Sequence, residues 1–142
     1  NRAFQYFSES SPASFNTNAD VRVIEPYAHG QFIESVESPY FGRCHVHWLT
    51  GTATTVMVGC VEGILGLRPT PEGINISPSI PSAWDGFTME KAYRGKTLHI
   101  KINNPDHHES GVKAMTVNGR QHAAGLILFS ELEDENEIVI TL

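Results

Sequence analysis

The sequence predicts an α+β chain in which a helical, loop-rich half is followed by an antiparallel β-sandwich. Apolar residues recur at steps of three and four over 53–65, which is the period of a helix. After Pro69, apolar and polar residues alternate, which is the period of a strand. Turn signals separate the alternating runs at short intervals, as in sandwiches of short strands. We therefore expect two domains, 1–68 and 69–142.

The first 42 residues indicate one short helix and one long loop. Residues 1–9 place aromatic and polar groups at helical spacing, and Pro12 ends that helix because proline disfavours helical backbone in the residue before it. The stretch 13–42 is rich in Ser, Asn, Gly and Pro. A loop of this length inside a compact domain is usually functional.

The clearest helix spans 53–65. A hydroxyl of Thr50 or Thr52 can accept a hydrogen bond from a free N–H group of its first turn. Gly66 is placed as a C-terminal cap, and Pro69 prevents continuation. The helix carries almost no charge on any face, so we expect it to be buried on most sides by partners outside this chain.

The second half reads as a series of strands with hairpin turns. The expected strands are 87–93, 98–103, 112–117 and 138–142. Arg94-Gly95-Lys96 suits a hairpin between the first two, and Asn118-Gly119 is the strongest short hairpin signal. No group of polar residues converges in this half, so a purely structural role is expected for it.

The composition excludes several classes of function. The chain has 10 Lys and Arg residues and a formal net charge of -6, which argues against a general nucleic-acid or acidic-membrane surface. It contains no run of 18 apolar residues, so no membrane span is expected. Cys44 and Cys60 lack the spacing of a zinc site and are expected to be free thiols in a reducing compartment, with a disulfide as the alternative.

The most suggestive local motif is 50–53, Thr-Gly-Thr-Ala, at the head of the central helix. Helix N-termini present unpaired N–H groups and a partial positive charge, which stabilise an anion. A glycine there lets a ligand approach the backbone, and threonine hydroxyls are further donors. Plain N-capping explains the same residues, and local sequence alone favours it.

Other candidate ligands lie just upstream. Arg43, His45 and His47 alternate, so in an extended segment they would share one face as phosphate, sugar or metal contacts, or as ordinary solvent-exposed or core residues. Trp48 and Trp84 are candidates for stacking on sugar rings, although buried tryptophan is more common.

Three carboxylates, Glu25, Glu34 and Glu37, lie in or near the long loop. Glycoside cleavage needs a carboxylic acid that protonates the leaving oxygen. Nothing in the sequence marks any of the three as having a raised pKa, so none is assigned this role.

Five segments together carry a resemblance to a known family. They are Glu25–Gln31 (EPYAHGQ), Trp48–Ala53 (WLTGTA), Ile64–Pro69 (ILGLRP), Ile80–Phe87 (IPSAWDGF) and Tyr93–Gly95 (YRG). In order and spacing they resemble glycoside hydrolase family 94, the family of cellobiose, cellodextrin, laminaribiose, chitobiose and β-1,2-oligoglucan phosphorylases.

The resemblance implies an architecture and a reaction. The chain is similar to a C-terminal fragment that holds the last helices of an (α/α)6 barrel over 1–68 and a C-terminal β-sandwich over 69–142. The rest of the same enzyme would then cover the apolar helix. The implied reaction is phosphorolysis of a β-linked gluco-oligosaccharide by inorganic phosphate, with inversion, to give α-glucose 1-phosphate.

The resemblance also implies site residues and partners. It assigns Thr50 and Gly51 to the phosphate, with Gln31 at the same site, and so overturns the local preference for capping. The general acid and the other phosphate ligands would precede Asn1, so no catalytic residue, metal ligand or cofactor is expected, and the chain alone is expected to be inactive. The expected partners are the oligosaccharide, phosphate and the rest of a cytoplasmic, homodimeric enzyme. The segment 42–47 departs from the cellobiose-phosphorylase pattern, which leaves the acceptor sugar open.

Two rival functions remain at this point. A free-standing carbohydrate-binding or structural module would account for the β-sandwich but not for the apolar helix. A hydrolase with a similar barrel, or an α-glucoside phosphorylase of related architecture, would account for both halves.

Overall fold

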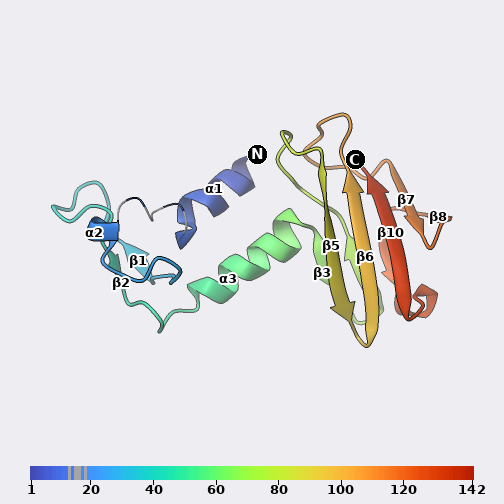
Figure 1. The fold of residues 1–142 in the computed structure, drawn as a ribbon, viewed down its shortest axis with the longest axis horizontal. Coiled ribbons are helices and arrows are strands. Elements are labelled where there is room, and N and C mark those ends of the chain that lie inside the picture. The colour runs from blue at the N-terminus through green and yellow to red at the C-terminus, as the bar shows by residue number, and fades with distance from the viewer. Residues whose placement is uncertain (13, 15–16, 18) are drawn as a thin grey trace. The chain divides into compact units, whose positions relative to one another are not determined.

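The computed structural model describes residues 1–12, 14, 17 and 19–142, so part of the predicted loop lies outside the described residues. The chain divides into two compact units, each considered by itself below. The N-terminal unit is Arg2–Cys60, and the C-terminal unit is Val61–Leu142 together with Asn1. Figure 1 shows helices and short strands in the first and β-sheets in the second.

Short elements make up the N-terminal unit. They are α1 (Arg2–Ser10), α2 (Ala19–Arg22), β1 (Phe32–Ile33), β2 (Cys44–His45) and α3 (Thr52–Val58). The helix predicted over 1–9 is confirmed, and it ends before Pro12 as expected. β1 and β2 pair antiparallel, with Phe32 opposite His45 and Ile33 opposite Cys44.

The helix predicted over 53–65 is present in two parts. α3 leads into a π-helical segment, η2 (Gly59–Ile64), so the second part has wider turns than the α-helix that the periodicity predicts. Gly66 follows with φ 78°, the left-handed conformation of a C-terminal glycine cap. A Cβ on Gly66 would lie 2.1 Å from the backbone oxygen of Ser77, so glycine is required there for space as well.

The largest sheet of the C-terminal unit has five strands in the order β5-β6-β10-β7-β8. These are β5 (Gly86–Tyr93), β6 (Lys96–Asn103), β7 (Ala114–Val117), β8 (Arg120–His122) and β10 (Glu135–Thr141). β10 runs parallel to β6, from Glu135 opposite Thr97 to Thr141 opposite Asn103. The expectation of a wholly antiparallel fold is wrong for this pair, because β10 reaches its place through a crossover and not through a hairpin.

A second, antiparallel sheet has three strands in the order β3-β4-β9. They are β3 (Leu67–Pro69), β4 (Gly73–Ile76) and β9 (Gly125–Leu128). Pro69 lies in the edge strand β3, a position where proline is tolerated. Tyr93 of β5 donates a hydrogen bond from its hydroxyl to the backbone oxygen of Gly73 in β4, at 2.7 Å, and so connects the two sheets.

The predicted hairpins are confirmed by backbone geometry. Arg94 and Gly95, between β5 and β6, have φ values of 52° and 84°. Asn118 and Gly119, between β7 and β8, have φ values of 50° and 74°. Two successive positive φ values define the tight turn whose twist matches that of the paired strands.

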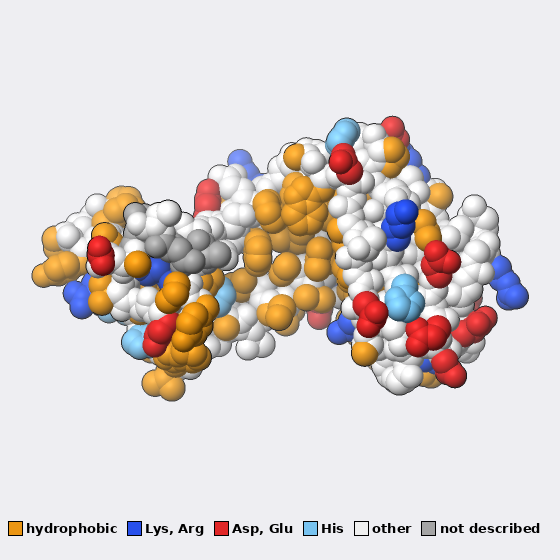
Figure 2. All heavy atoms as spheres, in the orientation of Figure 1, with side chains coloured by type: hydrophobic (Ala, Val, Ile, Leu, Met, Phe, Trp, Pro, Cys, Tyr) orange, Lys and Arg blue, Asp and Glu red, His pale blue; other side chains and the backbone are white. Residues whose placement is uncertain are grey.

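The core of the C-terminal unit follows the alternation of its strands. Every second residue of the central strands is almost fully buried, including Leu98, Ile100 and Ile102 in β6, Ile138 and Ile140 in β10, and Ile74 and Ile76 in β4. In Figure 2 charged and histidine side chains mark the outer face of β5, β6 and β10.

The N-terminal unit has little core of its own. Of the 18 buried hydrophobic residues found among the described positions, only Ala28 and Cys44 belong to it. Of the 16 exposed large hydrophobic residues, 14 belong to it, including Met57 and Val58 of α3. Figure 2 shows such side chains gathered over α1 and α3. The expected burial of the central helix is therefore absent from this chain, because no element of the described structure packs extensively over α3.

Two smaller expectations concern cysteines and membrane spans. Cys44 and Cys60 carry free thiols, so the alternative of a disulfide is wrong. Among the described residues, no helix combines the length and the apolar character needed to cross a membrane.

Candidate functional site

The residues assigned to phosphate by resemblance lie in the N-terminal unit, next to the β1–β2 hairpin and at the start of α3. Gln31 directly precedes β1, and its backbone N–H donates to the backbone oxygen of His45 at 2.9 Å. Gly30 approaches β2 so closely that a Cβ would lie 1.9 Å from Sγ of Cys44 and 2.9 Å from the oxygen of His45. Loop 25–31 is thus held against β2, and only glycine fits at position 30.

Arg22, at the end of α2, holds the other end of this loop. Its side chain is buried, with 4% of the residue surface exposed. Nη1 donates to the backbone oxygen of Glu25 at 3.1 Å, and Nη2 donates to that of Ala28 at 2.5 Å. The planar guanidinium suits two acceptors on one loop. Sequence reasoning missed this residue, although a charged side chain between Val21 and Val23 is a usable signal.

Trp48 links the same loop to the start of α3. Its indole Nε1 donates to Oε1 of Glu25 at 3.0 Å, and its ring meets the Tyr27 ring edge-on, with centroids 5.9 Å apart. The residue is 63% exposed, so the expectation of a buried tryptophan is wrong. Two of the five segments that carry the resemblance therefore touch each other through these side chains.

The backbone before α3 is unusual. Val46 and Trp48 both have positive φ, 53° and 67°, a conformation that costs side-chain-bearing residues energy and often occurs at functional sites. The Thr50 hydroxyl accepts a hydrogen bond from the N–H of Thr52 at 3.1 Å. Gly51, the N-cap residue, has φ -75°, and a Cβ there would meet no atom within 4 Å.

The Thr50 hydroxyl therefore satisfies one N–H of the first helical turn, although the N-cap residue is Gly51 and has no side-chain cap, and the space beside Gly51 is open. The N–H groups of Ala53 and Thr54 have no acceptor within α3, because the carbonyls they would reach precede the helix. This arrangement can accept a small anion. In the described part of the chain, no hydrogen bond joins the side chain of Gln31 to Thr50 or Gly51, so the structure brings their segments together but not these side chains.

The alternating run Arg43, His45 and His47 does not lie on one continuous extended segment. The positive φ of Val46 breaks the extended backbone on which that expectation depended. Nε2 of His45 instead lies 2.9 Å from Oε1 of Glu34, in a partly buried pair. Within the described ranges, no three His, Cys, Asp or Glu side chains are grouped so that they could hold a metal ion.

Two of the carboxylates near the loop, Glu25 and Glu37, are poor proton donors. The pKa of Glu25 is lowered from its ordinary value of 4.5, first by the hydrogen bond from Trp48. The pKa of Glu37 is lowered as well, first by the hydrogen bond from the Ser35 hydroxyl. Both groups are ionised at neutral pH, so neither suits a general acid.

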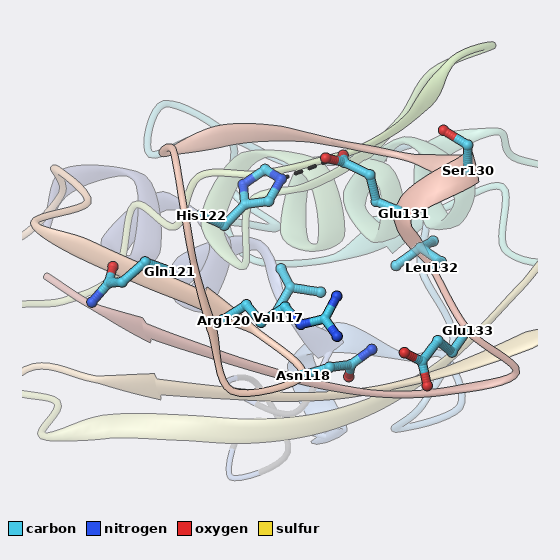
Figure 3. A pocket seen from close by; sticks show the side chains of 9 residues that line it. All are labelled: Val117, Asn118, Arg120, Gln121, His122, Ser130, Glu131, Leu132 and Glu133. Atoms are coloured by element: carbon cyan, nitrogen blue, oxygen red, sulfur yellow. Dashed lines mark hydrogen bonds and ion pairs between the residues drawn. The ribbon is translucent and has the colours of Figure 1, made fainter.

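The C-terminal unit holds a polar cavity that the sequence did not indicate. Its volume is about 420 Å³ (Figure 3). The lining residues are Val117, Asn118, Arg120, Gln121, His122, Ser130, Glu131, Leu132 and Glu133. The expectation that no polar cluster converges in this half is wrong, because the β7–β8 hairpin and the turn after β9 come together only in the folded chain.

Comparison with known protein families matches both halves of the chain. Residues 1–66 match the catalytic domain of the glycosyl hydrolase 94 superfamily. Residues 67–122 match the C-terminal domain of glycosyl hydrolase family 65.

Three curated relatives are similar over most of the chain. N,N'-diacetylchitobiose phosphorylase from Vibrio proteolyticus is 35% identical over 99% of this chain and 18% of its own length. The enzyme of the same name from Vibrio furnissii is 33% identical over 99% of this chain and 17% of its own length. Solabiose phosphorylase from Paenibacillus borealis is 32% identical over 87% of this chain and 16% of its own length. The chain thus spans about a sixth of the length of these relatives.

Proposed function

The chain belongs to the glycosyl hydrolase 94 superfamily, and we propose that it is the C-terminal part of an inverting β-glucoside phosphorylase. Such an enzyme cleaves a β-linked gluco-oligosaccharide with inorganic phosphate and releases α-glucose 1-phosphate. The names of the similar proteins, which are disaccharide phosphorylases, support this reaction class.

We assign residues 1–68 to the last helices of an (α/α)6 barrel and residues 69–142 to a C-terminal β-sandwich. The exposed apolar side chains of the N-terminal unit support the first assignment, since they need a cover that this chain does not provide. The two sheets and their inward alternation of buried residues support the second.

The proposed phosphate site consists of Thr50, Gly51 and Gln31. The single observation that carries it is the hydrogen bond between Trp48 and Glu25, because it joins the segment of Thr50 and Gly51 to the segment of Gln31. The open space beside Gly51 and the free N–H groups of the first helical turn supply room and donors for an anion.

The chemistry divides between this chain and the remainder of the enzyme. Phosphate is itself the nucleophile, so the protein supplies one general acid and places the anion in line with the scissile bond. The lowered pKa values of Glu25 and Glu37 support our placing of that acid outside this chain. We accordingly expect the 142-residue chain alone to release no glucose 1-phosphate.

The test uses Thr50→Ala in the full-length protein. Loss of one hydrogen bond to a charged ligand costs about 1–3 kcal/mol, so KM for phosphate should rise by roughly fivefold or more. Thr88→Ala, at an exposed position of β5, is the matched control and should leave KM unchanged. An unaltered phosphate KM in Thr50→Ala contradicts the assignment.

The rival functions predict different products. A hydrolase releases free sugar without phosphate, and an α-glucoside phosphorylase that inverts gives the β-anomer of the sugar phosphate. The match of residues 67–122 to a family 65 domain is the reason to test the α-glucoside phosphorylase as an alternative. Assays with and without phosphate, followed by NMR assignment of the anomer, separate all three. Assembly as a cytoplasmic homodimer, without a metal or other cofactor, completes the proposal.

A further inference from the structure

The cavity of the C-terminal unit lies between two turns that are distant in the sequence. The β7–β8 hairpin supplies one wall, and η3 (Phe129–Glu131) with the residues after it supplies the other. Its volume, about 420 Å³, falls in the usual range for small-molecule sites. Buried Val117 and Leu132 form its apolar part.

One pair of polar side chains in the cavity is already fixed. Nε2 of His122 lies 3.4 Å from Oε2 of Glu131, the bond drawn in Figure 3. The backbone N–H of Leu128 donates to the same carboxylate oxygen at 2.7 Å, and Nδ1 of His122 lies 2.7 Å from the backbone oxygen of Ala123. These bonds hold one side of the cavity rigid before any ligand arrives.

A second pair is unengaged. Arg120 and Glu133 line opposite sides, and in Figure 3 the guanidinium points toward the side from which Glu133 projects. They lie too far apart for an ion pair, and no other described residue bonds to either charged group. A ligand between them could thus accept hydrogen bonds from the Arg120 guanidinium, which has five N–H donors, and donate to the Glu133 carboxylate, which only accepts.

The cavity carries charges of both signs, the carboxylates of Glu131 and Glu133 and the guanidinium of Arg120. A simple ion of either sign therefore meets a like charge as well as an opposite one. A neutral ligand with several hydroxyl groups fits both sides, because each hydroxyl both donates and accepts. Vicinal hydroxyls can engage the guanidinium and a carboxylate at once, while the ring carbons contact Val117 and Leu132.

We propose that this cavity is a saccharide-binding site of the C-terminal unit, separate from the phosphate site. It uses neither Gln31 nor Thr50 nor Gly51, so it goes beyond the phosphorylase function proposed above. No Phe, Tyr or Trp ring stands among its nine described lining residues, so hydrogen bonds dominate the binding and the affinity is low. We expect a dissociation constant on the order of 1 mM.

The test is an NMR titration of the 15N-labelled 142-residue chain with cellobiose and, separately, with N,N'-diacetylchitobiose. At least one sugar should shift the amide signals of 118–122 and 130–133 in a saturable manner. Arg120→Ala and Glu133→Gln should each weaken this binding about tenfold, the loss of one charge-assisted hydrogen bond. Lys101→Ala, at an exposed position outside the cavity, should bind as the parent chain does.

Three results overturn the proposal. They are the absence of saturable shifts with both sugars, equal saturation by sodium phosphate at matched ionic strength, and sugar binding that Arg120→Ala and Glu133→Gln leave unchanged. None of these bears on the phosphate KM of Thr50→Ala in the full-length protein, so failure here and failure of the phosphorylase assignment are distinguishable.

Discussion

The indole Nε1 of Trp48 donates to the Oε1 atom of Glu25 at 3.0 Å, across 23 positions of the sequence. This contact joins two segments of the N-terminal unit, and it also favours the charged form of the carboxylate. This hydrogen bond is the largest cause of the lowered Glu25 pKa.

Trp48→Phe keeps an aromatic ring but removes the N–H donor. The pKa of Glu25 should then rise toward its ordinary value of 4.5, because the charged form loses the hydrogen bond that favours it. A 13C NMR titration of the Glu25 carboxyl group measures this shift. Trp84→Phe, in the C-terminal unit, is the control and should leave the Glu25 titration where it was; an identical curve in Trp48→Phe contradicts the prediction.

Gly51→Ala separates folding from ligand binding. The position has φ -75° and open space around the added Cβ, so the variant should fold, with a loss of stability of about 1 kcal/mol from the poorer N-cap residue. In the full-length protein the same methyl group would occupy the proposed phosphate position, so KM for phosphate should rise. An unchanged KM for phosphate in a normally folded variant would show that Gly51 is not part of the phosphate site.

Arg22→Met tests whether one guanidinium anchors loop 25–31. The substitution keeps an apolar stem but leaves the backbone oxygens of Glu25 and Ala28 without their donor, at a cost of about 1–3 kcal/mol. The amide of Gln31 should then exchange with solvent at least about fivefold faster, as measured by hydrogen exchange. Arg43→Met, at an exposed arginine, serves for comparison, and similar exchange rates in both variants would mean that Arg22 does not anchor the loop.

Glu135 gives the C-terminal unit a pH-dependent contribution to stability. Its pKa is lowered from 4.5, first by the hydrogen bond with His99, whose Nε2 lies 2.9 Å from Oε2. A lowered folded-state pKa means that the contribution is present above about pH 4.5 and is lost as the pH falls through the folded-state value. Urea midpoints should therefore fall less below that pH in Glu135→Gln than in the parent chain. In Glu72→Gln, which changes another exposed glutamate, the urea midpoint should fall with decreasing pH as it does in the parent chain.

Local signals predicted much of the fold. The Arg94-Gly95 and Asn118-Gly119 turns could be read from the sequence because each hairpin depends on two adjacent residues that tolerate positive φ. The position of β10 between β6 and β7 could not, because parallel pairing over a long crossover has no local signature. The antiparallel pair β3 and β4 could not be read either, because strands of three and four residues are too short to show alternation.

The candidate site divides in the same way. Thr50 and Gly51 stand at a recognisable helix start, so their geometry could be anticipated from neighbouring residues. The roles of Arg22 and Glu25 depend on contacts with other parts of the loop and with Trp48, and no spacing rule in the sequence reports such contacts. The burial of α3 by partners outside this chain stays a prediction, because apolar periodicity indicates that a face needs a cover, and among the described residues no element packs extensively over it.

The central place of β10 also sets the order in which the C-terminal unit can be assembled during translation. β6 and β7 leave the ribosome first, yet each pairs with β10 and not with the other. Until residues 135–141 emerge, both strands carry an unpaired edge, which is the feature of nascent sheets that recruits other strands. The five-stranded sheet therefore closes in one late step, and the interval before that step is when a nascent chain needs protection from its neighbours.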